Sequence, residues 1–106
     1  MRGRGKRGFR SISMRYEIEF LESALKEWNA LGATVRDQLR KKLKERCENP
    51  HVPSARLHGS QNRYKIKLRS AGYRLVYAVE DDRLVVLVIA IGKRDRSEVY
   101  EKAKYR

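Results

Sequence analysis

Basic side chains recur at every second position in the segment YKIKLR, residues 64–69. A period of two is typical of a strand, so Lys65, Lys67 and Arg69 share one face. If residues 70 and 71 form a turn, Arg74 lies directly across from Lys67 in the next strand. Facing like charges destabilise a strand pair, and an ordinary surface mixes both signs of charge. The pattern favours an anion site; the alternative is a solvated face whose side chains splay apart.

A second basic cluster, GKRDR, occupies residues 92–96, directly after the apolar run RLVVLVIAI at 83–91. Asp95 or Ser97 can cap a short helix that follows, and Tyr100 lies in its first turns. Taken alone, the cluster is better explained as a polar connection between a strand and a helix. Tyr100, taken alone, is better explained as a residue that packs that helix on a sheet.

The first half of the chain carries the pattern of one strand and two helices. Residues 16–20 alternate apolar and charged, which is typical of a half-buried strand, and an amphipathic helix follows to near Gly32. Thr34 is the expected cap of a second helix, which Asn49–Pro50 ends. The two helices are expected to form a hairpin. The apolar stripe of the second helix is Val35, Leu39, Leu43 and Cys47.

The second half is expected to form three more strands after a surface loop at residues 51–62. A turn at 70 and 71 sets an apolar register, in which Leu68 faces Tyr73, Ile66 faces Leu75 and Tyr64 faces Tyr77. The last strand, 83–91, is apolar on both faces, as a central strand is. We therefore expect an α+β fold: a mostly antiparallel four-stranded sheet with the helical hairpin on one face and the cationic groove on the other.

The composition describes one small basic domain. The 106 residues include 26 Lys and Arg against 13 Asp and Glu, a net charge of +13, which suits a polyanion such as nucleic acid, or an acidic protein or membrane surface. Residues 1–13 hold five cations and no acid, so we expect a basic flexible extension before a domain at 14–106. Leu84–Ile91, the longest apolar run, is too short to span a membrane. A single cysteine, Cys47, fits a reducing cytosol.

Three segments together resemble one known family. ALKEWNALGATVRDQLRKKL at 24–43, YKIKLRSAGYRLVY at 64–77 and GKRDRSEVY at 92–100 are similar to the RelE family of bacterial toxin–antitoxin ribonucleases. The resemblance covers essentially residues 14–106 and keeps the order strand, two helices, three strands, short helix. It implies a cytoplasmic toxin that cuts messenger RNA in the ribosomal A site by attack of the 2′-hydroxyl, with no metal ion and no other cofactor.

The resemblance also implies roles for single residues. Lys67 matches the general base, and Lys65 and Arg74 match the groups that stabilise the phosphate. Neighbouring cations lower the pKa of a lysine, which suits Lys67 to that role. Arg94 matches the group that assists the leaving oxygen, and Tyr100 a tyrosine that orients or stacks on RNA, or serves as the base. The residues expected to contact RNA or the ribosome are Arg69, Lys93, Arg96, Lys41, Lys42 and Lys44.

Several alternatives stay open beside this interpretation. The lysines of the second helix are equally well explained as a solvated face. His58 could act as an acid or base, but the family requires no histidine at that position. Cys47 is better explained as a buried residue than as a nucleophile. The whole chain could instead be a noncatalytic RNA-binding or ribosome-binding protein, or a ParE-like poison of DNA gyrase, against which the cationic set argues. The implied partners are the ribosome, an acidic RelB-type antitoxin, and operator DNA through the antitoxin complex only.

Overall fold

The computed structural model describes residues 15–93 and 98–106, and the predicted extension at 1–13 lies outside them. The domain has α+β architecture with one four-stranded sheet in the order β1-β4-β3-β2. β1 runs parallel to β4, and the other two pairs are antiparallel, as predicted. No helix in the described ranges is long and apolar enough to cross a bilayer. The elements are β1 (Glu17–Phe20), α1 (Glu22–Asn29), α2 (Ala33–Glu48), the 3₁₀ turn η2 (Pro53–Ala55), β2 (Arg63–Leu68), β3 (Tyr73–Glu80), β4 (Val85–Lys93) and α3 (Glu98–Lys104).

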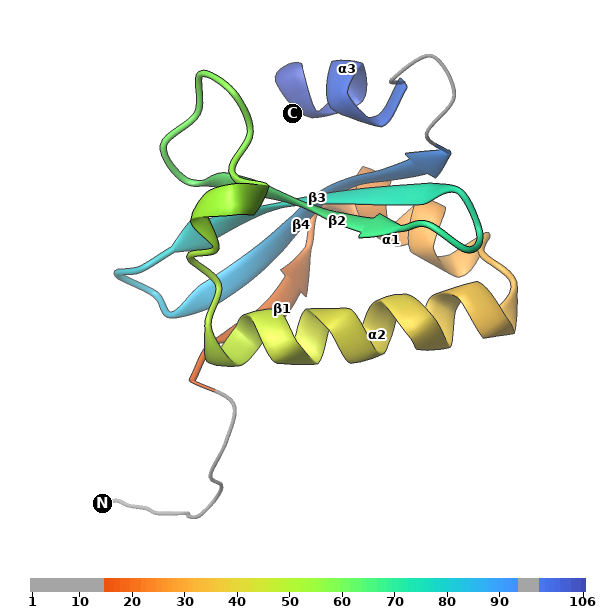
Figure 1. Ribbon diagram of the computed structural model, residues 1–106, viewed down its shortest axis with the longest axis horizontal. Coiled ribbons are helices and arrows are strands. Elements are labelled where there is room, and N and C mark those ends of the chain that lie inside the picture. The colour runs from red at the N-terminus through yellow and green to blue at the C-terminus, as the bar shows by residue number, and fades with distance from the viewer. Residues whose placement is uncertain (1–14, 94–97) are drawn as a thin grey trace.

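Helices cover both faces of the sheet (Figure 1). On one face, α2 buries its predicted stripe of Leu39, Leu43 and Cys47 against the sheet, together with side chains of α1. On the other face, Val99 and Ala103 of α3 pack on β3 and β4. The two central strands are therefore buried on both faces. The sequence predicted this for the strand at 83–91, and the strand order extends it to β3. The opposite face is thus partly occupied by α3 rather than left as an open groove.

The pairing of β2 with β3 has the register that the alternating pattern predicts. Tyr64 pairs with Tyr77, Ile66 with Leu75 and Lys67 with Arg74. The turn between the strands holds Gly72 at a φ of +69°, a left-handed conformation that glycine adopts without steric cost. Because the period of a strand is two, this register sends every apolar side chain of β2 to the α2 face and its lysines to the other.

The predicted cap of α2 is wrong. The helix begins at Ala33, so Thr34 lies inside its first turn, and the capping position is Gly32, whose carbonyl oxygen accepts a hydrogen bond from the Arg36 amide at 3.0 Å. Asp37 instead pairs with Arg40 one turn later. A small residue with extended backbone is thus sufficient to start this helix.

The boundaries of the fourth strand also differ from the prediction. β4 begins at Val85 because the preceding turn places Leu84 at a φ of +53°, with its side chain half exposed. Arg83 closes that turn by ion pairs with Glu80 and Glu19. At its other end β4 continues through Lys93, so the second basic cluster starts inside the strand rather than after it.

A carboxylate fills the part of the β4 edge that β1 leaves unpaired. β1 pairs only with residues 85–88. Beyond them Glu27 of α1 accepts a hydrogen bond from the Ile91 amide at 3.0 Å, and Lys102 donates to Glu27 at 2.6 Å and to the Ile91 carbonyl at 2.9 Å. Arg106 donates to Glu27 at 2.9 Å and to the Ile89 carbonyl at 3.0 Å. Glu27, Lys102 and Arg106, here called the α3 tether, hold the last helix on the sheet.

Candidate functional site

Four cations gather where the sequence predicts them, and they are called here the β2 cation cluster: Lys65, Lys67, Arg69 and Arg74. The apolar side chains of β2 enter the core beneath α2, which turns Lys65 and Lys67 to the face that carries α3. Arg74 of β3 lies across from Lys67 of β2 on one side and across from Gly92 of β4 on the other. The row Lys67, Arg74, Gly92 therefore runs across three strands on one face, and α3 lies next to its last member.

The cations of the cluster have no acidic partner among the described residues. Within residues 15–93 and 98–106, none of its four side chains forms a salt bridge, although seven such pairs occur elsewhere there. The pKa of Lys67 is lowered, chiefly by the charge of Lys65, then by slight desolvation and by Arg69 and Arg74. Lys67 therefore gives up its proton more readily than an isolated lysine, and the surrounding cations attract an anion.

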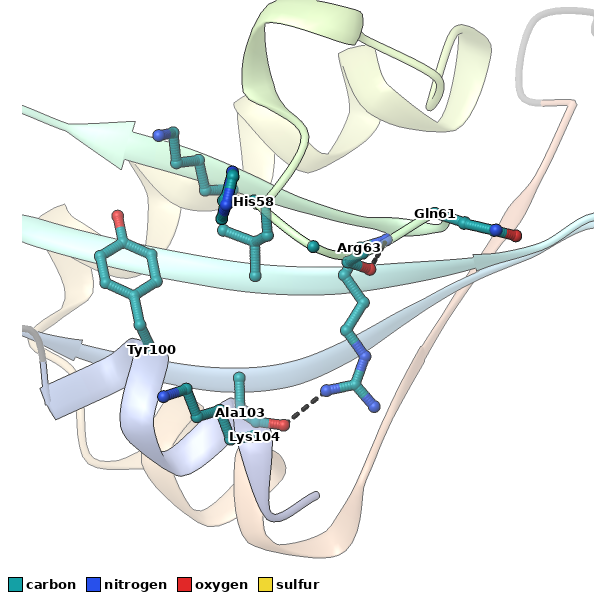
Figure 2. A pocket seen from close by; sticks show the side chains of 10 residues that line it. His58, Gln61, Arg63, Tyr100, Ala103 and Lys104 are labelled. Carbon is teal, nitrogen blue, oxygen red and sulfur yellow. Dashed lines mark hydrogen bonds between the residues drawn. The ribbon is translucent and has the colours of Figure 1, made fainter.

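A pocket of about 750 Å³ adjoins the cluster, between the loop 57–61, β2 and α3. Lys65 and Tyr100 both line it, so the fold brings together two candidates that are far apart in the sequence. Figure 2 shows Tyr100 rising from α3 near His58 of the loop, while Gln61 points away. An aromatic ring beside a cation is a common surface for a base and a phosphate of single-stranded RNA.

Two contacts fix the height of α3 above the sheet. Arg63 of β2 donates a hydrogen bond to the carbonyl oxygen of Ala103, as the dashed line in Figure 2 shows. On the other side Gly92 of β4 lies against α3, where an added Cβ atom would lie 3.5 Å from Val99 Cβ, an ordinary contact distance, and 3.3 Å from the flexible end of Lys102. Tyr100 is half buried and packs against the core beneath α3. It thus has the packing role and also lines the pocket.

Comparison with known proteins decides the family. Residues 18–98 match the family described as ParE toxin of type II toxin–antitoxin system, parDE. Over 93 residues the chain is 57% identical to the mRNA interferase toxin RelE of Escherichia coli strain K12, and the matched residues make up 88% of this chain and 98% of that protein. A putative RelE-like toxin of E. coli is 54% identical with the same coverage. The chain belongs to the RelE/ParE family of toxins.

Solved structures of the RelE branch share the fold. An arginine-to-alanine double mutant of the E. coli toxin RelE in the free state superposes with a TM-score of 0.81 at 55% identity, covering 88% of this chain and 98% of that one. The toxin in the intact E. coli RelBE toxin–antitoxin complex gives 0.73 at 56% identity, covering 76% of this chain and 99% of that one. These similarities confirm the predicted RelE-like fold.

The other residues that the RelE resemblance singles out lie in β4, in α2 and outside the described residues. Lys93 is exposed at the end of β4, beside Tyr73 of β3. Arg94 and Arg96 lie outside the described residues. The basic residues predicted on the second helix lie on α2, across the sheet from α3, and so do not share the face of the β2 cation cluster. They are Lys41, Lys42 and Lys44.

One basic residue beside the β2 cation cluster was not predicted from the sequence as a site residue. Arg46 donates hydrogen bonds to the Lys65 carbonyl oxygen at 3.2 Å and to the Tyr77 hydroxyl at 2.8 Å. In the sequence it is one of several cations on the polar sides of α2, and no periodic signal marks its contact with β2. Its neighbour Cys47 is buried as predicted, and burial raises the pKa of the thiol to about 11, far from that of a reactive cysteine.

Proposed function

We propose that this chain is the toxin of a type II toxin–antitoxin module and that it cleaves messenger RNA in the ribosomal A site. The observation that carries the proposal is the β2 cation cluster beside the Tyr100 pocket, on a chain 57% identical to a protein named mRNA interferase toxin RelE. The cluster provides charge for a phosphate and a lysine with a lowered pKa. Those are the groups that phosphodiester cleavage by an internal nucleophile requires.

The proposed reaction is attack by an RNA 2′-hydroxyl on the adjacent phosphorus, in line with the departing 5′-oxygen. Lys67, in its neutral form, takes the proton of the 2′-hydroxyl, and Lys65 and Arg74 stabilise the charge that develops on the phosphate oxygens. Arg94 is assigned to the leaving oxygen by family resemblance. The products are a 2′,3′-cyclic phosphate and a 5′-hydroxyl, and no metal ion or other cofactor enters the steps.

Two residues compete for the role of base. Lys67 is favoured because it is exposed in the middle of the cluster and its pKa is lowered by neighbouring cations. Tyr100 is half buried and lines the adjoining pocket, which suits it to stacking on a base next to the cut. We therefore assign the proton transfer to Lys67 and RNA orientation to Tyr100.

Dependence on the ribosome follows from the modest chemistry of these groups. A lysine and nearby positive charges contribute proton transfer and electrostatic stabilisation, but they do not hold a flexible RNA in line for attack. If the ribosome bends the messenger RNA into that geometry, positioning provides a large part of the rate. Free RNA is then a poor substrate, and the toxin acts where translation occurs, in the cytoplasm.

The proposed antagonist is an acidic RelB-type antitoxin. A solved neighbour of this chain is the intact E. coli RelBE complex, and a net charge of +13 favours an acidic partner. The complex is expected to reach operator DNA through the antitoxin alone. The basic segment 1–13 is proposed to be an extension of the domain at 14–106.

Gyrase poisoning is the second candidate, because the matching family description names ParE. The 54–57% identities, however, are to proteins named RelE, and the cationic cluster suits RNA cleavage. A noncatalytic RNA-binding protein would use the same positive surface without the proton acceptor.

Primer extension on a defined messenger RNA tests the proposal. Ribosomes stalled with an empty A site are compared with free RNA, using the wild-type protein and Arg94→Ala. We expect cuts only on ribosomes, within the A-site codon, and their loss in the variant. Absence of any cut, or DNA breaks that depend on gyrase after expression, would contradict the assignment.

A further inference from the structure

A second hollow lies at the outer edge of β2, on the side away from β3. It measures about 270 Å³ and is formed by the last turns of α2, by η2 and by β2. The side chains around it are four cations and one hydroxyl, with no carboxylate among them; apart from Ala55, the lining residues are Arg46, Ser54, Lys65, Lys67 and Arg69. We call this hollow the edge notch.

The guanidinium of Arg46 is held rigidly at the rim of the edge notch. Its Nη1 atom donates to the Lys65 carbonyl and to the hydroxyl of Tyr77, a fully buried residue, and the group lies 5.6 Å from the centre of the Tyr77 ring. The Tyr77 hydroxyl in turn donates to the Pro50 carbonyl at 2.8 Å. In the described part of the chain, Nε and Nη2 of Arg46 have no hydrogen-bond partner. The arginine therefore presents fixed donors, which bind an oxyanion at small entropic cost.

The edge notch is continuous with the proposed cleavage site. Lys65 lines the edge notch and also the pocket that contains Tyr100, and Lys67 lines the edge notch while facing Arg74 across β2 and β3. An RNA strand held at Lys65 and Lys67, with a base at Tyr100, thus meets the edge notch on the other side of Lys65. A hollow lined by four cations, with no aromatic side chain on which a base could stack, suits the RNA backbone.

We propose that the edge notch is a second phosphate site, which binds an RNA phosphodiester flanking the one that is cut. Arg46 and Arg69 bind the phosphate oxygens and Ser54 donates a further hydrogen bond. The proposal rests on the proposed function, since it places the substrate backbone in that same site. It adds a binding site that the family resemblance does not supply, because it depends on Arg46 of α2.

The test changes the charge of the edge notch without replacing Arg46, whose contacts with Lys65 and Tyr77 belong to the fold. Ser54 is exposed in η2, so Ser54→Asp leaves the core intact, and Arg69→Gln removes one cation. Asn29→Asp, at the exposed end of α1, is the control with the same change in charge. In single-turnover cleavage on ribosomes, both edge-notch variants should raise the half-saturating toxin concentration about threefold to tenfold relative to the control. Variants that match the control would overturn the proposal.

A second arm identifies which RNA supplies the phosphate. Uncharged methylphosphonates replace single phosphates beside the cut in the messenger RNA. If the edge notch holds messenger RNA, one of the methylphosphonate substitutions weakens RNA binding by the wild type. The same substitution has no added effect on RNA binding by Arg69→Gln. If every substitution acts equally on both proteins while the variant still binds ribosomes less well, the phosphate belongs to ribosomal RNA and the proposed flanking site in messenger RNA is overturned.

Failure of the edge notch and failure of the proposed function give different results. A wild-type protein that cuts nothing contradicts the function alone. The edge notch is then judged by binding to a 2′-O-methylated single-stranded RNA. The salt dependence of binding is the slope of log K against the logarithm of the salt concentration. Because Arg69→Gln loses one phosphate contact, the magnitude of that slope should fall by about 0.7. An unchanged slope would overturn the second phosphate site.

Discussion

Two groups of basic side chains in this molecule differ in how their charge is balanced. In the α3 tether, Lys102 and Arg106 surround Glu27 at 2.6 and 2.9 Å, and their side chains are only 34% and 20% exposed. In the β2 cation cluster, Lys67 and Arg74 lie opposite each other on neighbouring strands. No carboxylate of the described residues pairs with either side chain.

The difference separates a structural role from the proposed binding role. The cations of the α3 tether also bond to carbonyl groups of β4, so their charges and donors are satisfied within the fold. The cations of the cluster repel one another, and an arriving phosphate relieves that repulsion. The chain therefore keeps unfavourable electrostatics at the place where a polyanion is expected to bind.

The largest effect is expected for Lys67→Ala. Loss of the proposed base should slow single-turnover cleavage on ribosomes at least about a hundredfold. The melting temperature should stay the same or rise, because a like-charge contact with Arg74 is removed. Lys26→Ala, on the exposed side of α1, is the matched control and should cut at the wild-type rate. If Lys67→Ala cuts at the wild-type rate, or if it loses activity because it unfolds, the distinction between structural cations and the cations of the proposed site is contradicted.

Glu27→Gln should act mainly on stability. It leaves Lys102 and Arg106 without a counter-charge at a site where the Glu27 side chain is only 22% exposed. We expect a loss of about 1–3 kcal/mol in the free energy of unfolding, or about 5–15 °C in melting temperature. Glu101→Gln breaks an exposed pair with Lys104 in α3 and should cost no more than about 0.5 kcal/mol. Equal melting temperatures for the two variants would show that the α3 tether is not structural.

The same carboxylate predicts a pH dependence. Burial raises the pKa of Glu27, but hydrogen bonds from Arg106, Lys102 and the Ile91 amide outweigh it and lower the pKa below the ordinary 4.5. Because the folded-state pKa is depressed, the stabilisation is complete above 4.5 and is lost as the pH falls through the folded value. Urea unfolding from neutral to acidic pH should show the wild type and Glu27→Gln converging at the acid end. If the difference in the free energy of unfolding between the two proteins stays constant with pH, the ionised Glu27 is not the source of the stabilisation.

A smaller effect concerns the pH dependence of cleavage. Lys65 is the main cause of the lowered pKa of Lys67, so Lys65→Gln should let that pKa rise again. If neutral Lys67 is the base, the rise of the cleavage rate with pH should move to higher pH in the variant, separately from the lower maximal rate. Lys26→Gln, outside the cluster, should leave the profile unchanged. An unshifted profile with Lys65→Gln would point to Tyr100 as the base.

Periodic apolar patterns made much of the fold predictable. The register of β2 with β3, and hence the side of the sheet that carries Lys65 and Lys67, follows from apolar residues that must share one face. The stripe of α2 and its end before Pro50 follow in the same way. The resemblance to the RelE family added the roles that we propose for these residues.

Contacts between polar residues distant in the sequence left no such signal. Glu27 lies 75 positions before Lys102, and Arg46 is 31 positions before Tyr77, so neither pairing has a period that a sequence can reveal. The proximity of Tyr100 to Lys65 depends on the height and direction of α3, which the Arg63–Ala103 hydrogen bond and the α3 tether set. The errors at Thr34 and Leu84 concern turns, where several backbone solutions suit the same residues.

A titration of the folded protein with a 2′-O-methylated RNA trinucleotide at low salt, followed by ¹H–¹⁵N NMR, tests the central claim most directly. We expect saturable shifts to concentrate at the β2 cation cluster and the Tyr100 pocket, while the side-chain signals of Lys102 and Arg106 stay in place. Shifts that centre on the α3 tether and spare the cluster would contradict it.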